Sequence, residues 1–343
     1  MTGPALLLVP PDGPTAIAPD EVLLGLPVAR RTALAASRAG FATVAACGAA
    51  SGTALAKALE GTGAELLPSG ATPPEGAIVL PWNRVLRTAE VRALASGQPA
   101  ARLGVAVTAP ADRKRAERWL LDGLVKDSEG FMSRHFERKI SLAVSRVLAA
   151  TRVTPNEMTL VSVAIGLGGA LFFLSPSAAM QTAGALLFLL HSILDGCDGE
   201  LARLKFQESR FGGVLDFWGD NLVHAAVFSC MALGWSRASG GAIWPLVLGA
   251  LAVAGTLASA TWVYVKTMRR EKEGPLFTGV TSPDSVVARA ADALSRRDFI
   301  YLVLALSLFG KADWFLALTA AGAPLYFVLL FALDRRRPER KIA

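Results

Sequence analysis

Long apolar stretches between residues 155 and 333 constrain this chain more than any other feature of its sequence. A transmembrane helix needs roughly 20 predominantly apolar residues. Stretches near that length cover 156–174, 179–204, 212–235, 242–268, 298–311 and 313–333. Hydrophobic residues make up 52% of the chain, more than an ordinary soluble protein carries. The sequence therefore predicts an all-α integral membrane domain of six transmembrane helices over residues 153–343.

The N-terminal part, residues 1–128, lacks such stretches and alternates short apolar runs with helical patterns. Runs typical of strands cover 5–11, 42–46, 77–80 and 105–107, and helical patterns cover 23–39 and 52–59. Strands that alternate with helices indicate a parallel sheet covered on both faces, so we predict a Rossmann-like α/β domain here. The first residues lack a basic region and a sustained apolar core, and we expect no cleaved signal peptide.

Residues 129–152 connect the two parts and have a helical period. Phe136, Ile140, Val144, Val147 and Leu148 fall on one side, and Arg134, Arg138, Lys139 and Arg146 lie elsewhere around the helix. Such an amphipathic helix can lie flat at the membrane surface, with its cations near anionic lipid headgroups. A surface helix packed on the N-terminal domain is the alternative. We favour the interfacial helix because a predicted membrane span follows at once.

Positive charge, +7 overall, gathers on one side of the predicted spans. That side carries the 130s region, Arg203 to Arg210, Lys266 to Lys272, Arg296, Arg297 and the tail RRRPERK. The only basic residues in the opposite loops are Arg237 and Lys311. The positive-inside rule therefore predicts a multi-pass protein of the inner cell membrane, with both termini in the cytoplasm. No basic face interleaved with aromatic residues is present, so we expect no nucleic-acid partner.

Four aspartates interrupt this apolar region, in the segments D-G-C-D-G-E-L-A-R and G-G-V-L-D-F-W-G-D. Asp195 and Asp198 end the second predicted span, and Asp216 and Asp220 begin the third. Each pair shares a helix face, and the short connection lets the two helices run antiparallel, so the carboxylates meet. Carboxylates at membrane depth are costly unless a cation compensates them. We therefore predict two Mg²⁺ or Mn²⁺ ions, held by all four aspartates, that clamp a pyrophosphate on the cytoplasmic side.

Other interpretations of these aspartates remain open. They can form salt bridges with Arg203, Lys205 or Arg210, or they can line an ion or proton pathway. Clustering at one end of two helices, beside small residues, favours a bound ligand instead. Nearby His191 and His224 can orient a carboxylate, but a packed interhelical hydrogen bond explains them equally well, and we leave both off the predicted site.

Eight residues in this region fit the pattern D-x2-D-G-x2-A-R-x8-G-x3-D-x3-D without a gap or a substitution. They are Asp195, Asp198, Gly199, Ala202, Arg203, Gly212, Asp216 and Asp220. The pattern is the signature of the CDP-alcohol phosphotransferases, also called CDP-alcohol phosphatidyltransferases. The chain resembles this family over about 130–335, including the usual start of the first span at Thr154-Pro155-Asn156.

This resemblance implies an integral membrane transferase that moves a substituted phosphate from a CDP-alcohol to an acceptor alcohol and releases CMP. It implies that Asp195, Asp198 and Asp216 bind the metals, and that Asp220 sits at the metal site and acts as general base. Gly199, Ala202, Arg203 and Gly212 would line the CDP site. The family often forms homodimers, and we expect one here.

The N-terminal domain makes the chain resemble the bifunctional inositol-phosphate cytidylyltransferase and di-myo-inositol-phosphate-phosphate synthase type. Such a domain needs a glycine-rich loop with a following arginine and lysine to hold a triphosphate. Residues 7–19 read LLVPPDGPTAIAP instead, so we expect a nucleotidyltransferase-like fold without the activity. Recruitment of a separate cytidylyltransferase by this domain is a further alternative. The acceptor is then inositol phosphate or another polyol, or a headgroup alcohol with CDP-diacylglycerol as donor. The alternative is a non-catalytic, metal-dependent membrane binding or transport protein with a sensor domain.

Overall fold

A computed structural model describes residues 4–11, 13, 17–48, 53–69, 71, 76–99, 103–125, 136–267 and 299–335. It divides into two compact units. The α/β unit comprises Met1–Lys126, Arg146–Arg152 and Ala202–Gln207. The helical unit comprises Asp127–Ser145, Val153–Leu201 and Glu208–Ala343. The basic residues predicted at Arg134, Arg296, Arg297, 268–272 and 336–341 lie outside the described residues.

The α/β unit is built on a parallel sheet with strand order β5-β4-β1-β6. Its strands are β1 (Ala5–Val9), β4 (Thr43–Cys47), β5 (Glu65–Leu67) and β6 (Ile78–Pro81). Central β1 has the sequence ALLLV, and its three leucines are buried. An uninterrupted apolar strand of this kind is typical of a sheet that is covered on both faces. The small parallel sheet predicted for the N-terminal part is therefore confirmed.

The helices of this unit are α1 (Val28–Ala39), α2 (Ala54–Leu59), α3 (Thr88–Ala95) and α4 (Pro110–Asp122). The prediction of a helix from residue 23 was wrong, because β2 (Val22–Leu23) and β3 (Leu26–Pro27) form an antiparallel hairpin first. Leu24 (φ 47°) and Gly25 (φ 81°) form the turn of this hairpin, and both have left-handed backbone conformations. A right-handed helix cannot run through two such residues. A second pair joins β7 (Arg84–Val85) to β8 (Val105–Ala106).

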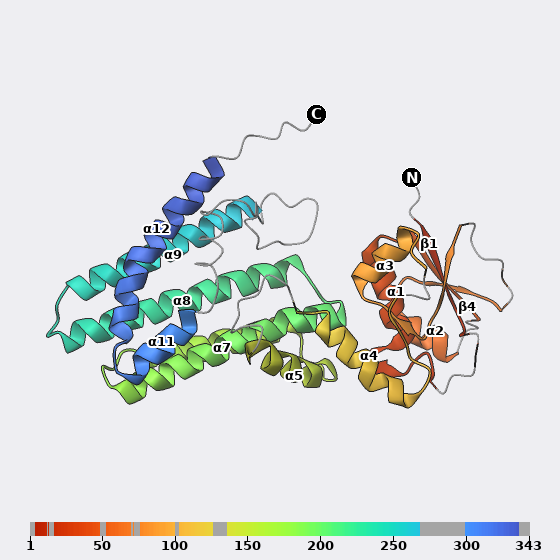
Figure 1. Cartoon of the computed structure of the whole chain (residues 1–343), viewed down its shortest axis with the longest axis horizontal. Coiled ribbons are helices and arrows are strands. Elements are labelled where there is room, and N and C mark those ends of the chain that lie inside the picture. Colours follow the sequence, from red (N-terminus) through yellow and green to blue (C-terminus); the bar gives the residue numbers. More distant parts are fainter. Residues whose placement is uncertain are drawn as a thin grey trace. The chain divides into compact units, whose positions relative to one another are not determined.

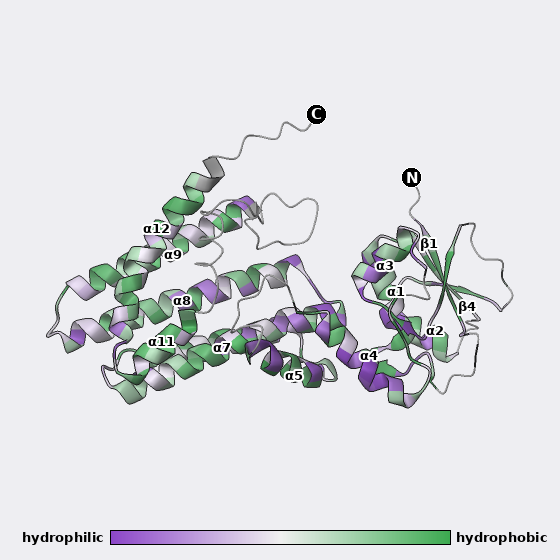
Figure 2. Cartoon of the chain, in the orientation of Figure 1, coloured by the Kyte–Doolittle hydropathy of each residue, from purple (hydrophilic) through white to green (hydrophobic). Residues whose placement is uncertain are grey.

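Helices occupy each stretch that the apolar pattern assigned to a span (Figure 1). They are α6 (Pro155–Phe172), α7 (Ala178–Lys205), α8 (Arg210–Ala238), α9 (Trp244–Thr267), α11 (Phe299–Leu308) and α12 (Ala312–Arg335), preceded by α5 (Arg138–Ala149). Among the described residues, Ala178–Lys205, Trp244–Lys266 and Ala312–Ala332 are long and apolar enough to cross a membrane. Figure 2 shows the apolar colouring that runs along these helices.

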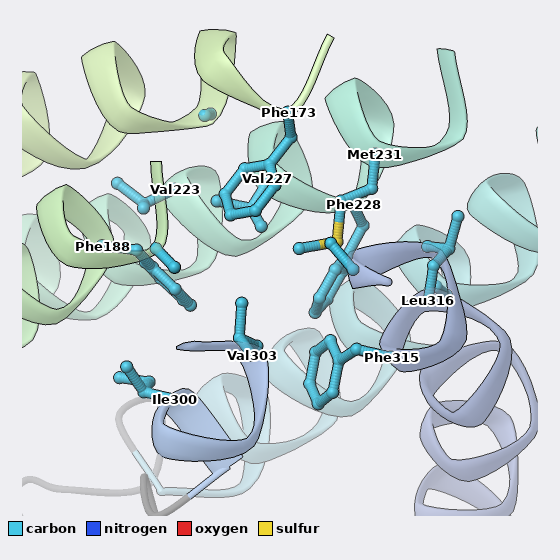
Figure 3. Packing of buried hydrophobic residues seen from close by; sticks show 14 of the residues in the cluster. Phe173, Phe188, Val223, Val227, Phe228, Met231, Ile300, Val303, Phe315 and Leu316 are labelled. Atoms are coloured by element: carbon cyan, nitrogen blue, oxygen red, sulfur yellow. The ribbon is translucent and has the colours of Figure 1, made fainter. Parts of the chain in front are cut away.

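Aromatic and branched side chains fill the interior of the helical unit (Figure 3). Phe315 stacks on Phe299 with ring centroids 5.7 Å apart and meets Phe228 at 6.2 Å. Outward-facing Leu171, Leu318 and Leu325 are exposed to the surroundings. An outer surface so rich in exposed large apolar side chains suits lipid rather than water, and the helical unit is a membrane domain.

Glycines let α6 approach α8 closely. A Cβ atom at Gly166 would lie 2.6 Å from the Cγ1 atom of Val223 on α8. A Cβ atom at Gly219 on α8 would lie 2.7 Å from the Cγ2 atom of Val163. Small residues at such contacts allow the tight helix packing that membrane domains use in place of a hydrophobic driving force. This packing brings the first turns of α6 to the motif-bearing ends of α7 and α8.

Candidate active site

Three of the four predicted aspartates form one acidic group. Asp195 and Asp198 lie on α7 with 3% and 6% of their surface exposed, and half-buried Asp216 lies on α8. One carboxylate oxygen from each lies within 4.8 Å of the others. A connection of four residues, 206–209, reverses the chain between the two helices, so residues near both helix ends become neighbours. The acidic group therefore forms because Asp195 and Asp198 share one face of α7 and because the chain reversal brings Asp216 of α8 next to them.

The donor set of this group suits a hard divalent cation. All three side chains offer anionic oxygen, which Mg²⁺ and Mn²⁺ prefer to nitrogen or sulfur. Oxygens on opposite sides of one Mg²⁺ ion lie about 4 Å apart, and paired ions in two-metal sites lie about 3.5–4 Å apart. The three carboxylate oxygens, which lie within 4.8 Å of one another, are therefore close enough to share one ion. These residues can hold a metal ion.

Thr159 on α6 supports the acidic group. Its hydroxyl donates a hydrogen bond to Oδ2 of Asp198, and the side chain is buried. Thr154 caps the start of α6: its Oγ1 accepts from the Glu157 amide at 3.3 Å, and its own amide donates to Oε2 of Glu157 at 2.8 Å. A capping box of this kind sets where a helix begins. The sequence thus places Thr159 one turn into α6, where it can orient the carboxylate.

Asp220 is not part of the three-residue acidic group. Its Oδ1 atom lies 3.3 Å from Nε2 of His191 and 3.9 Å from Nε2 of His224. Nδ1 of His191 lies 2.9 Å from the carbonyl oxygen of Ser162, and a neutral ring can donate to either this oxygen or Asp220 but not to both. The buried His191 ring therefore lies between Ser162 of α6 and the Asp220 carboxylate of α8. The metal-binding role of Asp220 stays a prediction.

The small residues of the pattern lie along the same helix ends. A Cβ atom at Gly212 would lie 2.9 Å from Oδ1 of Asn156, so the start of α8 lies close to the start of α6. Gly199 follows Asp198 directly on α7. Ala202 and Arg203 are the next pattern residues on α7, and they belong to the α/β unit. Their roles at a nucleotide stay predictions.

Glu200 occupies a variable position of the pattern and is fully buried. Its carboxylate accepts hydrogen bonds from Arg138 at 2.6 Å and from the hydroxyls of Ser141 and Ser145 at 2.7 Å each. These three donors lie on one face of α5 and fasten it to α7. The apolar residues Phe136, Ile140 and Val147 remain exposed, as an interfacial helix requires.

Sequence reasoning missed Thr159, placed Glu200 at a variable position of the pattern without a defined role, and left His191 off the predicted site. The only sequence signal for His191 was its position four residues before Asp195, on the same helix face. Thr159 follows the Thr154-Pro155-Asn156 start of the span, but neither that motif nor the aspartate pattern includes it. The partners of these residues come from other helices, which spacing along the chain does not reveal.

Comparison with known proteins places this site in a family. The model of the CDP-alcohol phosphatidyltransferase family matches residues 152–333. A bifunctional IPC transferase and DIPP synthase of Thermococcus kodakarensis is 42% identical over 127 residues, which are 37% of this chain and 28% of that protein. A phosphatidylinositol phosphate synthase of Corynebacterium glutamicum is 32% identical over 146 residues, 42% of this chain and 64% of that protein. Both matches span less than two thirds of the relative's length.

A solved structure of Mycobacterium tuberculosis phosphatidylinositol phosphate synthase with CDP-DAG bound aligns at 19% identity with a TM-score of 0.41. The alignment covers 59% of this chain and 96% of that one. The family match itself covers more than half of the chain and contains every residue of the pattern from Asp195 to Asp220. The chain belongs to the CDP-alcohol phosphatidyltransferase family.

Proposed function

We propose that this protein is a membrane transferase that moves a phospho-alcohol from a CDP-alcohol to an acceptor hydroxyl and releases CMP. The observation that carries the proposal is the acidic group of Asp195, Asp198 and Asp216 within a complete family pattern. Divalent ions bound there would neutralise the diphosphate and the charge that develops on the leaving CMP. Mg²⁺ and Mn²⁺ both suit the oxygen donors.

In this reaction a bond forms between the acceptor oxygen and the transferred phosphorus, and the phosphorus–oxygen bond to CMP breaks. The acceptor hydroxyl loses its proton as it attacks, and we assign Asp220 as the general base that receives it. Nε2 of His191 lies 3.3 Å from Oδ1 of Asp220, and it can orient the base in the tautomer that carries its proton on Nε2. Arg203 offers a guanidinium for phosphate oxygens, and Gly199, Ala202 and Gly212 leave room for the nucleotide.

The membrane arrangement is part of the same proposal. Six helices, α6 to α9, α11 and α12, cross the inner membrane, and the site and the N-terminal domain face the cytoplasm. The N-terminal domain has a nucleotidyltransferase-like fold without that activity, and a separate cytidylyltransferase supplies the donor. Two copies of the chain form a homodimer. The charge bias of the loops supports the orientation.

The donor is a soluble CDP-polyol such as CDP-inositol, or the lipid CDP-diacylglycerol. The relatives named for IPC transfer, DIPP synthesis and phosphatidylinositol phosphate synthesis support an inositol-type substrate. An assay of purified protein with each donor and inositol phosphate, with CMP release as readout, distinguishes the two. Release with one donor identifies it, and release with neither contradicts inositol phosphate as the acceptor.

Replacing Asp220 by asparagine tests the general base. We expect Asp220→Asn to lower the rate of CMP release by about a hundredfold or more, because general base catalysis contributes that much. The matched control is Asp313→Asn in the first turn of α12, which lies outside the pattern and should keep normal activity. Full activity in Asp220→Asn would remove Asp220 as base. Metal binding without CMP formation in the unmodified protein would instead support a binding or transport protein.

A further inference from the structure

Arg31 on α1 is a charged side chain with only 2% of its surface exposed. Its Nη2 donates to the carbonyl oxygens of Leu23 and Leu24, at 2.9 and 3.0 Å. Its Nη1 donates at 2.9 Å to the carbonyl oxygen of Leu204, near the end of α7. Burial lowers the pKa of Arg31 to about 10, so it remains a cation at neutral pH. A buried cation is costly unless several acceptors surround it, and Leu204 is one of those that make this position tolerable.

Phe206 lies just beyond the end of α7 in a conformation that phenylalanine rarely adopts, with φ at 56°. Its carbonyl oxygen accepts a 2.7 Å hydrogen bond from Nη2 of Arg38. The guanidinium carbons of Arg31 and Arg38 lie 5.8 and 5.7 Å from the centre of its ring. Cation–π contacts and a charged hydrogen bond therefore offset the strain of the left-handed backbone.

These contacts satisfy the carboxyl-terminal end of α7. The last carbonyls of a helix lack partners within the helix and carry partial negative charge. Here Leu204 and Phe206 receive guanidinium donors, and the carbonyl oxygen of Ala202 accepts from the amide of Gln207 at 2.9 Å. Ala202 and Arg203 of the family pattern immediately precede the held residues, Leu204 and Phe206.

We propose that the α/β unit serves as a clamp on the motif, in which Arg31 and Arg38 hold Leu204 and Phe206. Arg31 is then a positioning residue for Arg203, whose peptide group adjoins that of Leu204. The effect of the clamp on turnover rests on the proposed function. The clamp itself requires no nucleotide-binding loop, so the α/β unit can perform it without cytidylyltransferase activity.

Amide hydrogen exchange on the full chain in detergent tests the clamp. Arg31→Met removes the donors to Leu204 while keeping an apolar stem, and it should speed exchange at residues 204–207 by about tenfold or more. Arg30→Met is the matched control, because the neighbouring Arg30 donates only to Glu60 within the α/β unit among the contacts described. Exchange at 204–207 in Arg30→Met should match the unmodified protein.

A second variant covers the case in which Arg31→Met unfolds the α/β unit. Phe206→Ala leaves α1 intact but removes the ring that both arginines face, and it should also speed exchange at 204–207. If neither variant changes exchange there while the α/β unit stays folded, the clamp is overturned. If Arg31→Met unfolds the α/β unit, the Phe206→Ala variant decides: faster exchange at 204–207 supports the clamp, and unchanged exchange overturns it.

Kinetics connect the clamp to the reaction. Because Arg203 is expected to hold phosphate oxygens, Arg31→Met should raise the KM for the CDP donor by about tenfold, while Mn²⁺ binding, followed by electron paramagnetic resonance, stays unchanged. Unaltered KM with faster exchange would overturn the positioning role. An unmodified protein that releases no CMP contradicts the proposed function instead, and the exchange experiment still tests the clamp.

Discussion

A single hydroxyl, that of Thr159, shows how the site depends on individual residues. It donates to Oδ2 of the buried Asp198, an aspartate of the acidic group. Partners that hydrogen-bond to metal-binding carboxylates set their orientation and raise metal affinity. No feature of the sequence around Thr159 indicates this role, whereas the aspartates were identified from their spacing alone.

Thr159→Val keeps the shape of the side chain and removes the donor. We expect the affinity of the site for Mn²⁺ to fall by about tenfold, the lower end of the effect of such partners. Titration followed by electron paramagnetic resonance measures it without requiring turnover. Thr159→Ser should retain most of the affinity, and Thr182→Val on the amino-terminal half of α7 should retain all of it. Equal affinity in Thr159→Val would show that the hydroxyl does not orient Asp198.

At the scale of elements, Glu200 joins α5 to α7. A carboxylate that is fully buried accepts from Arg138, Ser141 and Ser145, so three donors of one helix meet one acceptor of another. The sequence predicted α5 as an amphipathic helix from its apolar side, and the structure places its opposite side against α7. The polar face is therefore the packed face, which leaves the apolar face available to lipid.

Glu200→Ala should destabilise the protein by about 3–5 kcal/mol, because it leaves a largely buried arginine and two hydroxyls without their acceptor. Thermal unfolding in detergent, followed by tryptophan fluorescence, measures the loss. Glu200→Gln keeps one carbonyl acceptor and should cost less than Glu200→Ala. An unchanged midpoint in Glu200→Ala would contradict the argument that this carboxylate fastens α5.

At the scale of the whole molecule, the distribution of charge predicts which helix ends face the cytoplasm. Gln207, beside α8's start, and Ser239, just after α8's end, are both exposed and lie at opposite ends of that helix. If α8 crosses the membrane once, these two positions lie on opposite sides. The acidic group lies near the Gln207 end of α8, through Asp216.

Single cysteines at these two positions test the orientation in a background without the natural cysteines. Ser239→Cys should react with a membrane-impermeant maleimide in intact cells, because the proposed orientation puts position 239 outside. Gln207→Cys should react only after the cells are made permeable. The reverse pattern would place the site outside, and reaction of both in intact cells would show that α8 does not cross.

The sequence alone determined the apolar stretches, the parallel sheet and the four aspartates, because each follows from local spacing on a strand or a helix. Only the tertiary structure decided which side chains meet across elements. Thr159 and Asp198 are 39 residues apart, His191 and Asp220 are 29 apart, and Arg31 and Leu204 are 173 apart. Helical periodicity says which face a residue occupies but not which helix that face meets. The close packing of α6 on α8 determines some of those pairings. The hydrogen bonds that Arg31 and Arg38 donate to Leu204 and Phe206 determine others.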